Sequence, residues 1–235
     1  SNSAPMPQVV LSDFSFVWPG STAPVLQNAS LHINASERVM LRGPSGSGKS
    51  TLLAAISGVT DIPTGAVTVA GQDIGALRAS KRDRFRADHM GLIFQVFNLV
   101  PWLSAVDNIL LPCRFSKRRH QRVQGSLEQE ARRLMETLGL NPDALASAKA
   151  STLSVGQQQR VAAARALIGA PEVILADEPT SALDPDAKDT FMRLLSQQAQ
   201  DSGAALLMVS HERGLDHHFD RVLQIEDFIG AGALT

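Results

Sequence analysis

The sequence GPSGSGKST at residues 43–51 fits the phosphate-binding pattern G-x-x-x-x-G-K-[ST] at every fixed position. An apolar segment before it predicts a strand and the pattern after it predicts a helix, which is the context such a loop requires. Its glycines allow successive backbone N–H groups to point at a phosphate, and a helix N-terminus attracts the same anion. We therefore predict a nucleotide-phosphate site formed by Gly43, Pro44, Ser45, Gly46, Ser47, Gly48, Lys49, Ser50 and Thr51.

Two residues of this loop have specific expected roles. Lys49 is expected to neutralise the β- and γ-phosphates, and the Ser50 hydroxyl is expected to bind Mg²⁺. A nucleoside triphosphate with Mg²⁺ is thus the predicted ligand of this loop.

An apolar run at residues 173–176 leads into two carboxylates, Asp177 and Glu178. Asp177 ends a predicted strand and is placed to hold Mg²⁺, while Glu178 is expected to point elsewhere because side chains alternate along a strand. Glu178 could then orient and deprotonate an attacking water. Solvated acids at a strand end are the alternative interpretation, and the phosphate loop makes it the less favoured one.

A second small polar loop, LSVGQQQR, lies at residues 153–160. Ser154 can cap a helix that begins at about Val155 or Gly156, and the hydroxyl with the first free N–H groups then forms another anion site. An ordinary helix N-cap is the alternative. Because the chain already has a loop for its own phosphates, a second anion site makes sense if it serves the nucleotide of another subunit.

The remaining patterns predict an α/β fold. Strands are predicted at residues 8–18, 30–35, 37–43, 65–74, 90–95, 172–177, 204–210 and 220–227, and helices at 50–59, 128–140, 156–170 and 186–203. The pattern becomes helical between residues 97 and 150. We predict a single domain, with residues 1–96 and 151–235 forming the core and 97–150 an inserted helical subdomain.

Composition limits the function. The net charge of −1 gives no field that recruits nucleic acid, and we expect no nucleic-acid partner. Cys113 is the single cysteine, so no disulfide can form within the chain, which suits a reducing compartment. No apolar run approaches the roughly 20 residues that span a bilayer, and the first residues lack a signal-peptide pattern. We expect an intracellular protein that reaches a membrane only through a partner.

Taken in order, the motifs resemble those of the nucleotide-binding subunit of ATP-binding cassette (ABC) transporters, over essentially the whole chain. Residues 43–50 correspond to the Walker A loop, LSVGQ to the family signature LSGGQ, and SALD at 181–184 to the D-loop. Asp177 and Glu178 correspond to the Walker B aspartate and the catalytic base. Gln95 in IFQ and His211 correspond to the Q-loop glutamine and the switch histidine.

The resemblance implies a P-loop NTPase core with a mixed sheet, an antiparallel β subdomain and an inserted α-helical subdomain. It implies an ATPase in which two copies sandwich two ATP molecules head to tail, so that each signature completes the other copy's site. It also implies a transmembrane permease as partner, with the chain on the cytoplasmic face of the cell membrane.

The same resemblance implies the site residues. The implied catalytic residues are Glu178, His211 and Gln95, and the implied Mg²⁺ ligands are Ser50, Gln95 and Asp177. Besides the Walker A loop, the implied nucleotide contacts are Trp18, Ser154, Val155, Gly156, Gln157 and Asp184.

The sequence departs from the family pattern at two positions. Val155 stands where the family usually has glycine, and we expect it to adopt helical φ as the first helical residue. Trp18 stands where tyrosine is commoner, and tryptophan should stack on adenine at least as well.

The segment FNLVPWLSAVDNILLP, residues 97–112, resembles the macrolide-exporter and lipoprotein-releasing branch. A mechanotransmission or cell-division-type ATPase that moves no solute is the alternative, and a soluble ABC protein acting on nucleic acid or ribosomes is less favoured. A non-hydrolysing binding module is disfavoured by the intact Lys49, Glu178 and His211.

Three weaker signals remain. The basic runs at residues 76–89 and 114–122 favour solvated surfaces over a lipid-facing one. His217 and His218 are adjacent and are expected to diverge, which disfavours a metal site. Phe97, Leu99, Pro101, Trp102 and Leu103 form either the core of the helical subdomain or a groove for the permease.

Overall fold

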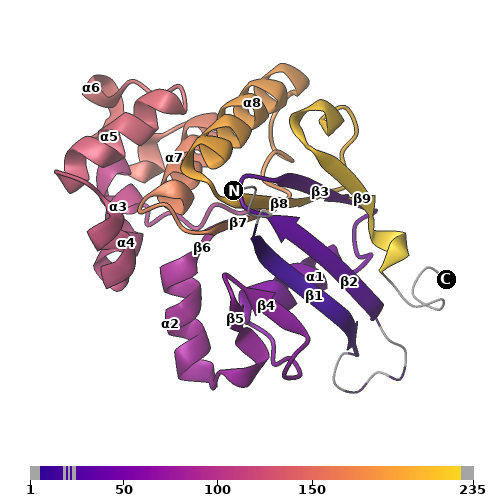
Figure 1. Ribbon diagram of the computed structural model, residues 1–235. Coiled ribbons are helices and arrows are strands. Elements are labelled where there is room, and N and C mark those ends of the chain that lie inside the picture. The colour runs from indigo at the N-terminus through magenta and orange to yellow at the C-terminus, as the bar shows by residue number, and fades with distance from the viewer. Residues whose placement is uncertain (1–5, 18–19, 21, 23–24, 229–235) are drawn as a thin grey trace, which may run out of the picture.

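Two sheets form the framework of the computed structural model, which describes residues 6–17, 20, 22 and 25–228 (Figure 1). The smaller sheet is antiparallel, in the order β2-β1-β4-β5. Its strands are β1 (Pro7–Phe16), β2 (Leu26–Asn34), β4 (Val67–Val69) and β5 (Gln72–Asp73). Along β1, buried positions recur between exposed ones, as expected for a strand with one face on the core.

The larger sheet has the order β6-β7-β8-β3-β9. Its strands are β3 (Arg38–Arg42), β6 (Met90–Ile93), β7 (Val173–Asp177), β8 (Ala205–Ser210) and β9 (Arg221–Gln224). Every residue of β8 is buried, as the continuous apolar runs of strands covered on both faces predict. The expected fold class is confirmed with one refinement. The core sheet, expected to be mixed, is parallel in all its described pairings, and the antiparallel pairings lie in the smaller sheet.

Helices cover the parallel sheet and extend beyond its β6 edge (Figure 1). They are α1 (Lys49–Ser57), α2 (Ala79–His89), α3 (Ala105–Phe115), α4 (Lys117–Arg122), α5 (Leu127–Thr137), α6 (Pro142–Leu145), α7 (Val155–Leu167) and α8 (Pro185–Ser202), with 3₁₀ turns η1 (Ile74–Ala76), η2 (Ala150–Thr152), η3 (Asp216–His218) and η4 (Ile225–Asp227). Every helix from α3 to α6 begins at a side-chain cap, from Ser104, Ser116, Ser126 and Asn141 respectively.

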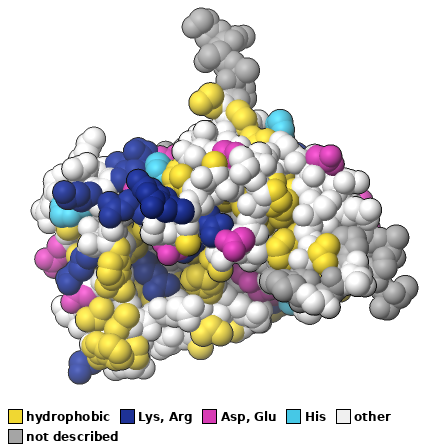
Figure 2. Space-filling model, turned by 90° about the horizontal axis from the view of Figure 1, so that it is seen from below, with side chains coloured by type: hydrophobic (Ala, Val, Ile, Leu, Met, Phe, Trp, Pro, Cys, Tyr) yellow, Lys and Arg dark blue, Asp and Glu magenta, His cyan; other side chains and the backbone are white. Residues whose placement is uncertain are grey.

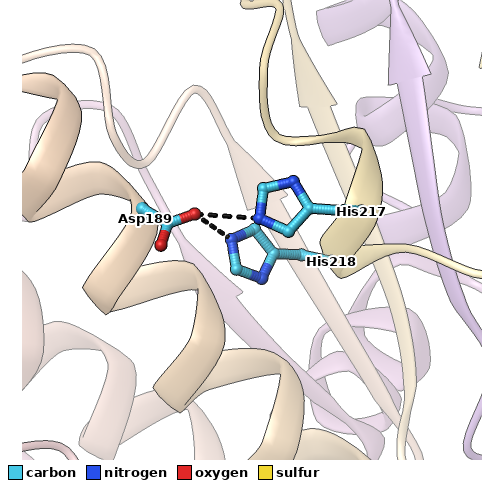
Figure 3. A group of neighbouring side chains, drawn as sticks. All are labelled: Asp189, His217 and His218. Atoms are coloured by element: carbon cyan, nitrogen blue, oxygen red, sulfur yellow. Dashed lines mark hydrogen bonds and ion pairs between the residues drawn. The ribbon is translucent and has the colours of Figure 1, made fainter.

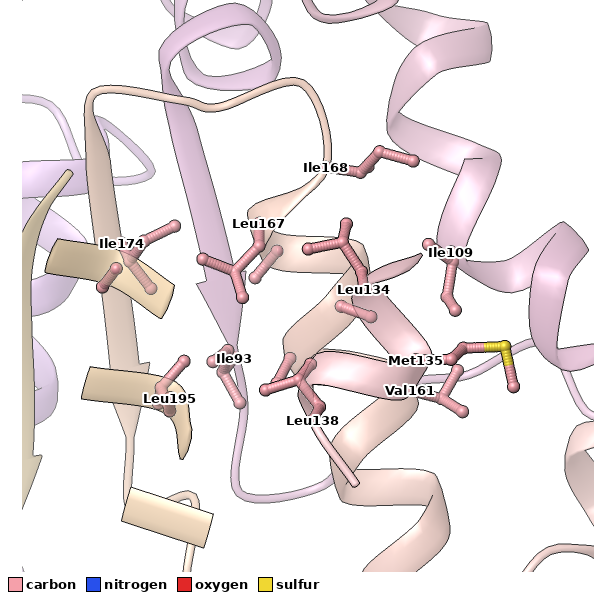
Figure 4. Packing of buried hydrophobic residues seen from close by; sticks show 14 of the residues in the cluster. Ile93, Ile109, Leu134, Met135, Leu138, Val161, Leu167, Ile168, Ile174 and Leu195 are labelled. Carbon is pink, nitrogen blue, oxygen red and sulfur yellow. The ribbon is translucent and has the colours of Figure 1, made fainter. Parts of the chain in front are cut away.

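The helical region between β6 and α7 shares one hydrophobic cluster with the sheet (Figure 4). Ile109 of α3 and Leu134 of α5 belong to the same cluster as Val161 of α7 and Ile174 of β7. The division into a core and the inserted subdomain 97–150 remains a prediction, and this continuous packing joins the two parts mechanically.

Most basic side chains of the two basic runs are exposed, as expected, but one arginine in each run is buried. Residues 79–89 form helix α2, which the sequence analysis missed, and its Arg82 is buried beside Asp61. Arg119 in the second run is only 3% exposed. Its guanidinium donates to the carbonyl oxygens of Arg165, Ala166 and Ile168, each at 2.9 Å, and so satisfies the free carbonyls at the end of α7. Burial lowers its pKa to about 10, which leaves it charged at neutral pH.

Glu172 connects this basic region to α2. Its Oε2 lies 2.8 Å from His89 Nδ1, and its Oε1 accepts from Arg118. Burial raises the pKa of the Glu172 carboxyl, but the hydrogen bonds from His89 and Arg118 outweigh it and lower the pKa to about 2 from 4.5.

Glu172→Gln should therefore reduce the free energy of unfolding at pH 7 by about 1–3 kcal/mol, because each unit of pKa shift is worth about 1.4 kcal/mol. The folded-state pKa is depressed, so the stabilisation is complete above pH 4.5 and is lost as the pH falls toward 2. The difference between wild type and variant should accordingly shrink at pH 3. Urea unfolding at both pH values measures this, with Glu128→Gln on the exposed side of α5 as the control. An equal difference at both pH values would contradict the assignment.

Candidate functional site

The phosphate loop, residues 43–48, runs from the carboxyl end of β3 into α1. Gly48 has φ 101° as the N-cap of α1, a conformation that favours glycine. A Cβ at Gly43 would overlap the side chain of Ile225, so that position also requires glycine. No side chain caps the N-terminus of α1, which leaves its first N–H groups free to bind an anion. The Ser47 hydroxyl is buried and has no hydrogen-bond partner among the residues that the structure describes.

A cleft of about 440 Å³ opens over this loop. It is lined by Val25, Ser45, Gly46, Gly48, Lys49, Ser50, Thr51, Gln95, Asp177 and Glu178. The structure thus brings the predicted loop, the two predicted acids and Gln95 to one cleft. Val25 was missed by the sequence analysis, since an apolar residue just before a strand has no local signal for such a role.

Lys49 is almost fully buried within this cleft. Its Nζ donates to the carbonyl oxygen of Gly43 and, at 3.2 Å, to that of Pro44. It also lies 3.4 Å from Glu178 Oε1. The ammonium group is therefore held over the loop by the backbone and by one carboxylate.

Asp177 lies on the same side of the cleft as Ser50, with Oδ2 3.4 Å from Ser50 Oγ. Burial, together with the neighbouring Glu178 carboxylate, raises the pKa of Asp177, while the Ser50 hydroxyl and the Lys49 ammonium oppose that shift. Two carboxylates close together in a partly buried site repel each other, and a divalent cation bound between the cleft residues would relieve that repulsion. A hydroxyl and a carboxylate are oxygen ligands of the kind that Mg²⁺ prefers.

Glu178 does not point away from Asp177, contrary to the expectation from strand alternation. Strand β7 ends at Asp177, and Glu178 adopts φ 46°, in the left-handed region. That turn directs its carboxylate into the cleft as well, where only 8% of the residue is exposed. Left-handed backbone in a non-glycine residue is costly and is found where the surrounding structure enforces it, often at functional sites.

His211 holds the Glu178 carboxylate from the end of β8. Its backbone N–H donates to Glu178 Oε1 at 3.0 Å, and its Nδ1 lies 2.9 Å from both carboxylate oxygens. The next residue, Glu212, is buried and bonded to Thr180 and Lys188. This second network, which the sequence analysis missed, ties the His211 segment to the loop after β7 and to α8.

The signature loop lies apart from the phosphate-loop cleft. Ser154 and Gln157 form a capping box, in which Ser154 Oγ accepts from Gln157 N at 3.2 Å and Gln157 Oε1 accepts from Ser154 N at 2.9 Å. Val155 is the first residue of α7, as predicted, and its side chain is half-exposed. Neither Gly156 nor these residues line the cleft of the chain's own phosphate loop.

One predicted nucleotide contact among the described residues, Asp184, is not brought to the cleft. It caps α8 by accepting from Ala187 N at 2.9 Å. Trp18 lies outside the described residues, so its predicted contact with adenine stays a prediction. None of the helices in the described part of the chain has the length and apolar character needed to cross a membrane.

A glycine-rich loop between a parallel strand and a helix, facing acids at the end of another strand of the same sheet, defines a P-loop nucleotide-binding protein. Residues 26–181 match the family described as ABC transporter. The chain therefore belongs to the ABC transporter family, as the resemblance implied.

Similar proteins agree with this assignment. The lipoprotein-releasing system ATP-binding protein LolD of Ruegeria sp. (strain TM1040) is 40% identical over 89% of this chain and 89% of its own length. The macrolide export ATP-binding/permease protein MacB of Rhodopirellula baltica is 38% identical over 87% of this chain, which spans only 29% of that protein.

A solved structure described as the dimeric post-hydrolysis state of the ATP-binding cassette MJ0796, bound to ADP and Pi, matches with a TM-score of 0.77. It is 32% identical and covers 92% of this chain and 93% of its own. The predicted function is thereby confirmed at the level of the family. The chain is an ATP-binding and ATP-hydrolysing subunit of the kind that powers ABC transporters.

Glu178→Gln should leave ATP binding intact and slow hydrolysis by roughly 10²–10⁴-fold, the usual contribution of a positioned general base. The amide keeps the size of the side chain and loses its basicity. Nucleotide affinity and steady-state turnover measure the two effects, with Glu226→Gln at an exposed position as the control. Turnover close to wild type would exclude Glu178 from this role.

Proposed function

We propose that the chain is the ATPase subunit of a transporter of the lipoprotein-releasing and macrolide-export branch, acting as a homodimer with a membrane-embedded permease. One observation carries the proposal. The catalytic-base candidate Glu178 is held in the phosphate-loop cleft, between Lys49 and His211, while the signature loop lies outside that cleft. The names of the relatives favour a transporter subunit over the mechanotransmission, cell-division and nucleic-acid alternatives.

In the proposed reaction, Glu178 takes the proton from the water that attacks the γ-phosphate. His211 keeps the carboxylate aimed through its backbone N–H and its ring, so the base is oriented before the reaction begins. Lys49 moves its charge from Glu178 and the loop carbonyls to the phosphate oxygens. Ser50, Asp177 and Gln95 would hold Mg²⁺, which when bound neutralises charge on the phosphates.

We further propose that the signature loop acts on the partner's ATP. The helix N-terminus at Ser154 presents free N–H groups and is exposed rather than turned toward its own cleft. A head-to-tail pair of copies would bring this terminus to the other copy's phosphates. The dimeric form of the similar cassette structure supports such a pairing.

Mixing two damaged chains tests the shared site. In a Glu178→Gln background, one chain carries Lys49→Ala and the other Ser154→Arg. If the signature acts on the partner's nucleotide, each homodimer has two damaged sites. The mixed dimer has one site with both lesions and one intact site. Nucleotide retained by a heterodimer that neither parent forms is the expected result.

A signature that served its own chain's nucleotide would leave one lesion in every site of every combination. Mixing would then restore nothing. Absence of retained nucleotide after mixing, with both chains folded by circular dichroism, therefore overturns the shared-site proposal while leaving the ATPase assignment intact.

The proposed permease surface lies beside the helical region. The sequence left five residues undecided between the core and a groove for the permease: Phe97, Leu99, Pro101, Trp102 and Leu103. All five are half-buried or exposed, and Trp102 is 72% exposed. Phe97, Leu99 and Pro101 line a hollow of about 480 Å³, together with Gln95. A second hollow of about 390 Å³ includes the exposed Phe94 and Phe115 beside Arg86 and Arg165.

Figure 2 shows such a surface from below, with hydrophobic side chains lying among Lys and Arg side chains on the side where α2 and α4 lie. Apolar groups rimmed by charges are typical of a protein-binding surface. Gln95 lines both the phosphate-loop cleft and the hollow beside Phe97. A permease segment seated there would touch the residue that also faces the nucleotide, and we propose this as the route by which ATP binding reaches the membrane.

Trp102→Ser should leave the ATPase rate of the isolated subunit unchanged and weaken its binding to permease-containing membranes by roughly 10-fold or more, the scale of a central interface tryptophan. Sedimentation with native membranes stripped of peripheral proteins measures the binding. Val59→Ser, at another exposed apolar side chain, is the matched control. Equal losses in both variants would indicate non-specific adhesion rather than a defined surface.

A further inference from the structure

His217 and His218 converge on Asp189, contrary to the expectation that adjacent histidines diverge (Figure 3). That expectation assumed a regular helix. The two residues instead end η3, a single 3₁₀ turn packed against α8, and their rings lie side by side with centroids 4.0 Å apart. Both therefore reach the same side chain on the second turn of α8.

The convergence places three donor atoms together. His217 Nε2 lies 2.9 Å and His218 Nε2 2.8 Å from Asp189 Oδ1, and the three candidate ligand atoms all lie within 4.8 Å of one another. Over residues 6–17, 20, 22 and 25–228, no other set of three His, Cys, Asp or Glu residues gathers in this way.

The surroundings combine rigidity with access. The His218 side chain is 8% exposed, whereas those of His217 and Asp189 are 63% and 53% exposed. The turn is fixed by backbone bonds from His218 N to Leu215 O at 3.1 Å and from Phe219 N to Asp216 O at 3.1 Å, and by the ion pair of Asp216 with Arg42. One ligand is thus fixed in place, and the other two face solvent, from which an ion can enter.

We propose that Asp189, His217 and His218 form a binding site for a divalent transition-metal ion, with zinc as the best-suited probe. Two imidazole nitrogens and one carboxylate oxygen suit Zn²⁺ and its first-row neighbours, whereas Mg²⁺ prefers oxygen ligands alone. Three protein ligands leave a coordination position for water. Each Nε2 would offer its lone pair to the ion, so the proton of each neutral ring would reside on Nδ1.

A metal ion at this site would join α8 to the segment that follows β8. Asp189 belongs to the helix that begins after Asp184, and the histidines end the segment that begins at His211. The ion pair between Glu212 and Lys188 already connects these two elements. A bound ion adds a second connection a few residues further along, and should restrain the segment that holds the Glu178 partner His211.

The competing interpretation is a purely hydrogen-bonded cluster, in which each ring donates Nε2–H to the carboxylate and no metal binds. The two interpretations differ in measurable affinity for zinc. Titration calorimetry of tag-free protein with ZnCl₂, without nucleotide, should show one site per chain, and MgCl₂ should show none there. Saturating zinc should raise Tm by roughly 5–11 °C, the range expected at about a hundred times Kd for a domain of this size.

The variants change the two exposed ligands, His217 and Asp189, because substitutions at exposed side chains should preserve the fold. His217→Ala and Asp189→Asn should each weaken zinc binding by at least about 10-fold, since even outer-shell changes at metal sites cost that much. His32→Ala and His120→Ala, at exposed histidines elsewhere, should leave the affinity unchanged. His211→Ala should also leave it unchanged, which separates this site from the phosphate-loop cleft.

Amide hydrogen exchange tests independently whether the bound ion joins residues 211–219 to α8. Zinc should slow amide exchange over residues 211–219 in the wild type and not in His217→Ala, because the ion joins that segment to α8. The proposal is overturned if zinc does not bind at one site per chain, or if its affinity is the same in His217→Ala and Asp189→Asn as in the wild type. It is equally overturned if MgCl₂ binds this site as well as zinc does.

Discussion

The ion pair between Lys49 and Glu178, at 3.4 Å, joins parts of the chain that are far apart in sequence. It can form because β7, β8 and β3 are parallel neighbours, so their carboxyl ends meet at one edge of the sheet. Lys49 follows β3, Glu178 follows β7 and His211 follows β8. A buried ammonium group and a buried carboxylate stabilise the site only as partners, because either one alone would be a buried uncompensated charge. The phosphate loop, the acids and the histidine therefore depend on one another through this contact.

The same edge of the sheet also connects the cleft to the helical region. Gln95 follows β6, the strand next to β7, and lines both the cleft and the hollow beside Phe97. Arg119 of α4 donates hydrogen bonds to the last carbonyl oxygens of α7, the helix that begins at the signature loop. The hydrophobic cluster continues from the sheet into α3 and α5 without interruption. Packed side chains and buried hydrogen bonds therefore join both ends of α7 to the rest of the molecule.

The sequence predicted most of the elements and the family correctly, and its errors share one cause. The phosphate loop, the buried strands and the Ser154 cap are local patterns, and the structure bears them out. The direction of Glu178 was wrong because the strand ends one residue before it and the backbone turns left-handed there. The solvated character assigned to Arg119 was wrong because the charge is offset by carbonyls of a helix distant in sequence. His217 and His218 converge because a short turn faces α8.

By itself, then, the sequence determined the phosphate loop, the Ser154 cap and the fold class, because these depend on the spacing of residues within one turn or one strand. It also determined the family, because the motifs occur in a fixed order. Only the tertiary structure decided which side chains meet. The contact of Glu178 with Lys49, the burial of Arg119 and the shared bond of His217 and His218 to Asp189 are examples. Each depends on how elements separated by many residues pack. That packing is set by the burial of the whole apolar surface, which no local pattern records.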